Sequence, residues 1–229
     1  MTTQEFSNSF DVQLNSFGLP DNSNIKLNEY EKSVFLTKAQ KEIVVSFYNG
    51  KNALLNSFEK TEELKRYLSS LVKTKVISPV LANSDEVITN KSKIVNLPED
   101  LWFITFETAK IQSDDECLNG KELEVTPVTQ DTFHRTKNNP FRKDNSRRVL
   151  RLDIGDNKVE LVSDYNISEY KVRYIKALSP IILTVLEGVD IEGKTDITEC
   201  TLHPVLHQVI LDKAVELAVQ SYGLTLKNQ

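Results

Sequence analysis

Near the end of the chain, one short stretch gathers the residue types that could do chemistry. Cys200, His203 and His207 have the spacing C-x2-H-x3-H, which would place both imidazoles on one face of a helix and give a zinc ion three acceptable ligands. The spacing supplies no fourth ligand, and Pro204 occupies the position where a zinc protease has its glutamate. We therefore expect structural roles for these side chains and no metal or cofactor, with a metal-binding enzyme as one alternative hypothesis.

Motifs for covalent catalysis and nucleotide binding do not occur in the sequence. No serine lies in G-x-S-x-G, and neither G-x-G-x-x-G nor G-x-x-x-x-G-K-[ST] is found. The acidic cluster Asp114-Asp115-Glu116 stands next to Asn119-Gly120, a pattern typical of a solvated hairpin, with a divalent-cation site as the less favoured interpretation. We predict that the chain is not an enzyme.

The middle of the chain is basic and contains two interleaved aromatic residues. Its members are Phe133, Arg135, Lys137, Phe141, Arg142, Lys143, Arg147, Arg148 and Arg151. Such a run can form a nucleic-acid surface, a patch that meets an acidic neighbour, or a solvated face. Because the whole chain has a net charge of −5, a protein that coats nucleic acid is disfavoured. We expect Arg142, Arg147 and Arg148 at a subunit or ring interface, with a DNA-binding accessory protein using residues 135–151 as a second alternative.

The bulk composition indicates a folded protein that is made in a reducing compartment. With 229 residues, of which 39% are hydrophobic, the chain can bury a substantial core. Two cysteines do not make a disulfide framework, and no apolar run approaches the roughly 18 residues of a membrane span. The first ten residues lack the pattern of a signal peptide. We expect synthesis in a host cytoplasm and no membrane partner.

The chain begins with an amphipathic helical pattern. Thr2 and Glu5 have capping-box spacing, and apolar residues follow at helical steps: Phe6, Phe10, Leu14 and Phe17. Such a helix must dock its apolar face, either on its own domain or on a neighbouring subunit. Phe6 and Phe10 are therefore candidate interface residues.

Two further helices are predicted before residue 74. Residues 30–36 read as a short strand or turn in which Tyr30 is a candidate interface residue, and Thr37 with Gln40 forms a capping box for a helix that stops at Asn49-Gly50. Thr61 is expected to open the third helix.

Beyond Lys73 the apolar period changes from about 3.6 to 2, which predicts strands. The predicted strands are 76–77, 93–95, 101–106, 122–125, 148–152, 158–162, 170–175 and 181–183. Apolar residues alternate with charged ones in several of them, a pattern that favours antiparallel pairing with one wet face. Gly155-Asp156-Asn157 is a hairpin signal, and residues 129–136 could form a helical turn.

The last predicted element is a helix that starts at Pro204 and ends near Gly223. The fold class is therefore α+β: a helical bundle of residues 1–74 completed by 202–224, packed with an antiparallel sheet or sandwich of residues 75–200. We expect the two parts to form one integrated domain.

Several segments, taken together and in order, resemble structural proteins of crAss-like tailed phages of gut Bacteroidales. These segments are 27–40, 97–102, 125–129, 138–142, 170–176, 179–183 and 200–218. The chain looks like a neck or tail ring protein of such a phage, one of the connector rings below the portal.

The resemblance implies a homo-oligomeric ring in the virion, twelvefold to match a portal, that contacts the portal and adjacent connector or tail proteins. Genomic DNA would pass through the ring without sequence-specific contact. A mildly acidic chain suits such a channel, because few phosphate contacts would hold the duplex. We expect residues that face the channel to be net acidic or neutral.

Overall fold

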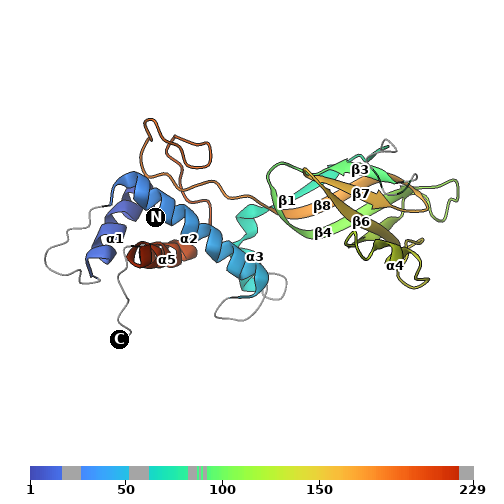
Figure 1. Cartoon of the computed structure of the whole chain (residues 1–229), viewed down its shortest axis with the longest axis horizontal. Helices are drawn as coiled ribbons and strands as arrows, with labels where there is room; N and C mark the ends of the chain where they lie inside the picture. Colours follow the sequence, from blue (N-terminus) through green and yellow to red (C-terminus); the bar gives the residue numbers. More distant parts are fainter. Residues whose placement is uncertain (17–26, 52–61, 82–86, 88, 90–91, 222–229) are drawn as a thin grey trace. The chain divides into compact units, whose positions relative to one another are not determined.

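A computed structural model of the chain describes residues 1–16, 27–51, 62–81, 87, 89 and 92–221, and these form two compact units (Figure 1). The helical unit comprises Met1–Leu71 and Leu178–Gln229, and the sheet unit comprises Val72–Ala177. Helices and an eight-stranded sheet together confirm the α+β class. Residues 178–200, expected in the β-rich part, are in the helical unit; that the chain acts as one integrated domain stays a prediction.

Among the described residues of the helical unit, the regular structure consists of four α-helices and one 3-10 helix. They are α1 (Thr3–Ser16), α2 (Glu29–Asn49), α3 (Glu62–Tyr67), the 3-10 helix η1 (Ser69–Leu71) and α5 (Val205–Ser221). The predicted box at the start of α1 is confirmed: the Glu5 N–H donates to Thr2 Oγ1 at 3.3 Å, and the Thr2 N–H donates to Glu5 Oε2 at 2.9 Å. The predicted caps at Thr61 and Gly223 lie outside the described residues.

The start of α2 differs from the prediction. The helix begins at Glu29, and its capping box is made by Asn28 and Glu31 rather than by Thr37 and Gln40. Residues 30–36, predicted to be a short strand or turn, are therefore helical. The predicted end is confirmed, because α2 stops at Asn49 and Gly50 follows with φ 70°, the left-handed conformation that glycine adopts freely.

Packing of α1, α2 and α5 forms the core of the helical unit. Phe6 and Phe10 of α1 are 1% and 0% exposed. Helix α5 contributes Leu206, Ile210 and Ala214 to this core. Burying each phenylalanine side chain stabilises the unit by on the order of 1.5–3 kcal/mol, so α1 is held firmly by its own chain.

The part of the sheet unit that the structure describes has eight strands and one short helix. The strands are β1 (Val72–Ile77), β2 (Val80–Leu81), β3 (Lys93–Asn96), β4 (Leu101–Gln112), β5 (Glu122–Pro127), β6 (Arg148–Gly155), β7 (Lys158–Val162) and β8 (Asn166–Lys176), and the helix is α4 (Phe133–Lys137). Their order in the sheet is β1-β8-β4-β5-β6-β7-β3-β2. Six of the neighbouring pairs are antiparallel, whereas β5 and β6 are parallel. Strands β5 and β6 are parallel because the connection containing α4 carries the chain back along the strand direction, so that β6 starts beside the start of β5.

The chain connectivity requires this sheet to curl. Strands β1 and β2 lie at opposite ends of the strand order, yet only Ser78 and Pro79 separate them in sequence. Two intervening residues span at most about 11 Å between the flanking Cα atoms, so the first and last strands must approach each other. Figure 1 shows the resulting curled sheet. Its enclosed face carries the main apolar core of this unit, which includes Val149, Leu161 and Val172.

Helix α4 covers part of the outer face of the sheet. Phe133 of α4 is 1% exposed and packs with Leu150, Leu152 and Val162, while Val149, which precedes Leu150 in sequence, faces the main core. Residues 149–152 of β6 are thus buried on both faces of the sheet. The prediction of a solvent-exposed face for residues 148–152 is therefore wrong. The predicted helical turn in residues 129–136 is confirmed, with the helix proper at 133–137.

One predicted turn is confirmed, whereas one predicted strand is not found in the sheet. The hairpin between β6 and β7 is confirmed, with Asp156 and Asn157 at φ 49° and 55°, as a two-residue turn of this kind requires. Strand β8 ends at Lys176, and the predicted strand at 181–183 is not part of the sheet. Ile182 forms only an isolated bridge to Thr198 in the helical unit.

Candidate functional site

The structure does not bring Cys200, His203 and His207 together as a metal site. The Cys200 thiol lies 3.7 Å from Gln40 Oε1, and His207 Nε2 lies 3.1 Å from the carbonyl oxygen of Leu202. Among the residues that the structure describes, no group of three or more histidine, cysteine, aspartate or glutamate side chains could hold a metal ion. The metal-binding alternative therefore has no geometric support in this part of the chain.

The three predicted interface residues in the helical unit lie in different environments. Phe6 and Phe10 are inside the core of this unit, where they dock on their own chain. A contact between them and a neighbouring subunit would require α1 to leave this core. Tyr30, near the start of α2, is 37% exposed and accessible to a partner. A subunit-interface role for these three residues stays a prediction.

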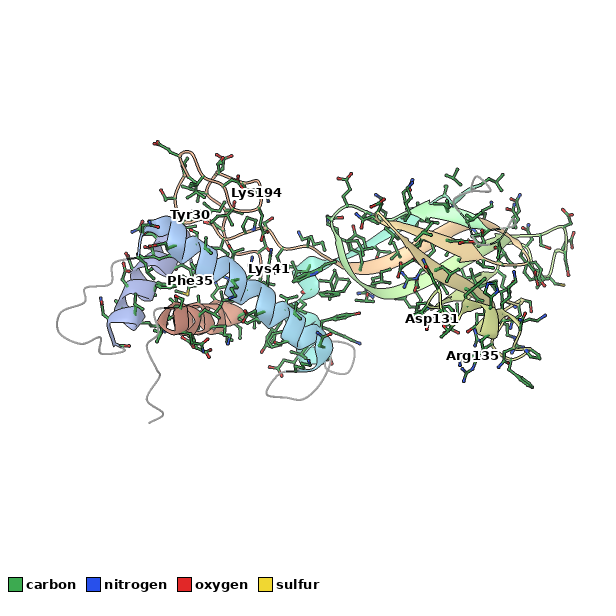
Figure 2. All side chains as sticks on the ribbon, in the orientation of Figure 1. Tyr30, Phe35, Lys41, Asp131, Arg135 and Lys194 are labelled. Carbon is green, nitrogen blue, oxygen red and sulfur yellow. The ribbon has the colours of Figure 1, made fainter. Side chains whose placement is uncertain are left out.

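Residues 131–148, here called the basic segment, form a cationic surface on the sheet unit. The segment contains six cations and two aspartates, giving it a net charge of +4 in a chain whose net charge is −5. Five of the cations are exposed and Arg148 is half-buried. Within the described parts of the chain none of the six forms an ion pair. Figure 2 shows Arg135 of α4 and Asp131 beside it on this surface.

At the tip of the basic segment, Phe141 is 88% exposed. Its N–H donates to Asn139 Oδ1 at 2.9 Å, and its carbonyl oxygen accepts from Arg148 Nη1 at 3.3 Å. The N–H groups of Arg142 and Lys143 both donate to the Asn139 carbonyl oxygen, at 3.0 and 2.9 Å. These bonds fix the backbone around Phe141, whose exposed side chain is followed in sequence by Arg142 and Lys143. An exposed aromatic with neighbouring arginines is the composition of an interface hot spot.

A groove of about 640 Å³ runs beside Phe141. It is lined by Glu124, Thr126, Pro127, Val128, Thr129, Thr132, Thr136, Phe141, Arg142 and Arg148. Most of these side chains are hydroxyl or apolar, and none of them is a nucleophile paired with a base. The groove is therefore suited to contact with a protein surface.

Arg151, which the sequence placed in the basic surface, is buried. Its Nε lies 3.3 Å from Glu107 Oε2, and Tyr170 donates its hydroxyl to the same carboxylate oxygen at 2.6 Å. Burial raises the pKa of Glu107, although the charge of Arg151 and the hydrogen bond from Tyr170 both oppose this shift. Arg151 thus forms an ion pair in the interior of the sheet unit and is not part of the exposed cationic surface.

The helical unit presents a second surface, formed by residues 184–199 and here called the arm. The chain leading into the arm is held on α2 by buried polar side chains spaced along one helix face. The Ile181 N–H donates to Thr37 Oγ1 at 3.0 Å, and the Thr37 hydroxyl donates to the Ile181 carbonyl oxygen at 3.3 Å. Gln40 Nε2 donates to the Ser179 carbonyl oxygen at 2.6 Å, and the Leu183 N–H donates to Ser33 Oγ at 3.0 Å.

The arm is folded on itself and also bound to α2. Ile182, Leu186 and Ile191 form a small apolar cluster, and Ile191 and Lys194 close a turn. Glu192 in this turn pairs with Lys41 of α2, and Lys41 and Lys194 are both labelled in Figure 2. Although it has no long helix or strand, the arm therefore has a defined surface.

That surface is acidic and apolar. Five carboxylates and one lysine give the arm a net charge of −4. The carboxylates are Glu187, Asp190, Glu192, Asp196 and Glu199, and all five are exposed. Between them Val185, Val189 and Ile197 are 55%, 46% and 53% exposed. The arm thus combines five exposed carboxylates with three exposed β-branched side chains within 16 residues.

Comparison with known proteins shows the family. A family described as "Phage tail ring protein 3/4" matches residues 1–229. The chain belongs to this family of phage tail ring proteins. It is 45% identical over 224 residues to "Ring protein 3" of Bacteroides phage crAss001, covering 96% of each chain. It is 35% identical over 235 residues to "Ring protein 4/5" of the same phage, covering 97% of this chain and 94% of the relative.

These matches confirm the resemblance to ring proteins of crAss-like phages and place the chain among virion structural proteins. Along the described residues no helix is both long enough and apolar enough to cross a membrane.

No motif in the sequence pointed to the arm, and its five carboxylates were not considered together. Phe141 was recognised only as an aromatic residue within the basic run. Five carboxylates within 13 residues are a signal that the sequence contains. The exposure of Val185 and Val189 is not visible in the sequence, because a valine in a loop is often buried.

Proposed function

We propose that this ring protein forms a closed homo-oligomeric ring in the head-tail connector below the portal, and that genomic DNA passes through its channel. The observation that supports this most strongly is the family match over the whole chain, together with the ring proteins of a crAss phage as relatives. Twelve copies would match a twelvefold portal. The partners are copies of the chain, the portal and adjacent connector or tail proteins, after synthesis in the host cytoplasm.

The surfaces of the two units support a role in assembly over a role in chemistry. A cyclic head-to-tail ring needs two unlike surfaces on each copy, because its contacts are heterologous. The basic segment and the arm are unlike in charge, and each carries exposed apolar side chains. Arg142, Arg147 and Arg148, expected at an interface, lie in the basic segment, and their role there is part of this proposal.

The charge balance bears on the DNA channel. Outside the basic segment the chain has a net charge of −9, so most of its surface would repel a duplex. We propose that the channel is lined by acidic or neutral residues, since a wall with few phosphate contacts lets DNA slide.

The mass of the purified protein tests ring formation. One chain has a mass of 26.1 kDa, so a twelvefold ring would have a mass of roughly 310 kDa. Light scattering coupled to size-exclusion chromatography, followed by electron microscopy of the peak, should show annular particles near this mass. A purified chain that stays monomeric and is also missing from virions would contradict the proposal.

DNA binding by the basic segment is the second candidate function, because its six cations form no ion pair with described residues. Duplex DNA that is retarded by the protein at low salt and released as salt rises would favour this candidate. No retardation at low salt would remove it.

A further inference from the structure

The basic segment and the arm have complementary charges. Residues 131–148 have a net charge of +4 and the arm, residues 184–199, has a net charge of −4. Most of the charged side chains in both surfaces are exposed, and four of the five arm carboxylates form no ion pair with any residue described in the structure. Each surface therefore has unpaired charges that are opposite in sign to the net charge of the other surface.

The apolar side chains of the two surfaces also suit each other. Phe141 projects from the basic segment at 88% exposure, and the arm exposes Val185, Val189 and Ile197. An aromatic ring that inserts among small branched side chains is removed from water at the centre of the interface, which stabilises the complex, while the charged side chains form the rim of the interface. Hydrogen bonds within each chain hold both surfaces, so little ordering would be needed on binding.

We propose that the basic segment of one copy binds the arm of the next copy in the ring, with Phe141 seated among Val185, Val189 and Ile197. This inference rests on the proposed ring function and names the contact that closes the ring. A second copy is the favoured partner because every copy supplies both surfaces, one on each unit. This is what a heterologous head-to-tail contact requires.

Two features favour a protein partner over DNA for the basic segment. The exposed phenylalanine at its tip and the adjacent groove, lined by Pro127, Val128 and several threonines, offer apolar contact that a phosphate backbone would not use. Bases in an intact duplex are stacked, so Phe141 could not reach their faces.

Reciprocal charge reversal tests the contact. One variant combines Arg142→Glu with Arg147→Glu in the basic segment, and the other combines Glu187→Lys with Glu199→Lys in the arm. All four side chains are exposed, and neither pair of substitutions removes a described ion pair. A matched control combines Lys171→Glu with Arg173→Glu, two exposed cations on β8 that lie outside both surfaces.

Sedimentation velocity of the full-length protein at low and high salt gives the readout. The wild type and the β8 control should associate at low salt, and high salt should weaken this association. Each reversed variant should associate about tenfold or more weakly by itself, because the altered surface then has a net charge of zero and no longer attracts its oppositely charged partner. An equimolar mixture of the two reversed variants should recover association, because each supplies the surface that the other needs. Phe141→Ala should weaken association at both salt concentrations.

Four results would overturn the inference, and the fourth separates it from the proposed ring function. The first is a wild type that remains monomeric at low salt up to hundreds of micromolar, and the second is association that neither reversal changes. The third is duplex DNA binding that Arg142→Glu with Arg147→Glu abolishes while self-association persists. Annular particles formed equally by the wild type and all variants would refute this contact and leave the proposed ring function intact.

Discussion

His207 is a titratable side chain placed in the core of the helical unit. It is 6% exposed, its Nε2 lies 3.1 Å from the Leu202 carbonyl oxygen, and its ring packs on Phe6 with centroids 5.4 Å apart. Burial lowers the pKa of this imidazole, because the charged form loses solvation. The residue that the sequence offered as a metal ligand is thus part of the packing of α1 on α5.

The lowered pKa of His207 predicts a loss of stability in acid. Since the folded state binds the proton less tightly than the unfolded state, the stabilisation is complete above the unfolded pKa of about 6.5 and is lost as the pH falls below it. Urea unfolding between pH 7.5 and about pH 5 should show this decline in the wild type. His207→Gln keeps a donor for the Leu202 carbonyl oxygen and cannot titrate, so its decline should be shallower.

His134 provides the control for that measurement. It is exposed on α4, so His134→Gln should retain the wild-type dependence on pH. Equal pH profiles for the wild type and His207→Gln would show that burial of this imidazole does not set the acid stability.

Residue type alone could not separate the buried arginine from the exposed ones. Arg147, Arg148 and Arg151 are close in sequence, yet they are exposed, half-buried and buried respectively. What distinguishes Arg151 is a carboxylate from β4, Glu107, which becomes a neighbour only when the sheet forms. No local pattern in the sequence contains that information.

At the scale of elements, sequence patterns predicted regular structure well where the pattern is local. The capping box of α1, the end of α2 at Gly50 and the hairpin at residues 155–157 depend on side chains a few residues apart, and all three are confirmed. The start of α2 was missed because Asn28 and Glu31 made a better capping box than Thr37 and Gln40. Thr37 and Gln40 instead bind the backbone of residues 179–181, more than 130 residues away.

The role of Thr37 in holding the chain that leads to the arm predicts a large effect of a small substitution. Thr37→Val keeps the shape of the side chain but leaves the buried N–H and carbonyl groups of Ile181 without their partner. The free energy of unfolding should fall by about 1–3 kcal/mol. Urea denaturation measures this, and hydrogen exchange at the Ile181 amide should accelerate.

Thr195→Val is the matched control for that substitution. Thr195 is an exposed residue of the arm, so the same chemical change there should alter the unfolding free energy by less than about 0.5 kcal/mol. Similar losses in the two variants would argue against a specific anchoring role for Thr37.

At the scale of the whole molecule, the family and the surfaces lead to the same account. The chain belongs to a family of phage tail ring proteins. Three side chains that were candidates for chemistry make contacts within the fold: Cys200 and His207 in the helical unit, and Arg151 in the interior of the sheet unit. The exposed side chains include a cationic segment with a protruding phenylalanine and an acidic arm. The resemblance to ring proteins could be found in the sequence, whereas the complementarity of these surfaces needed the structure.

The central claim is that this protein acts as a ring in the connector, and cryo-electron microscopy of the intact virion tests it most directly. The account predicts density for this chain as a closed ring below the portal, twelvefold, with DNA or an open channel on its axis. Virions that lack the chain, or that contain it as an isolated copy outside any ring, would contradict the account.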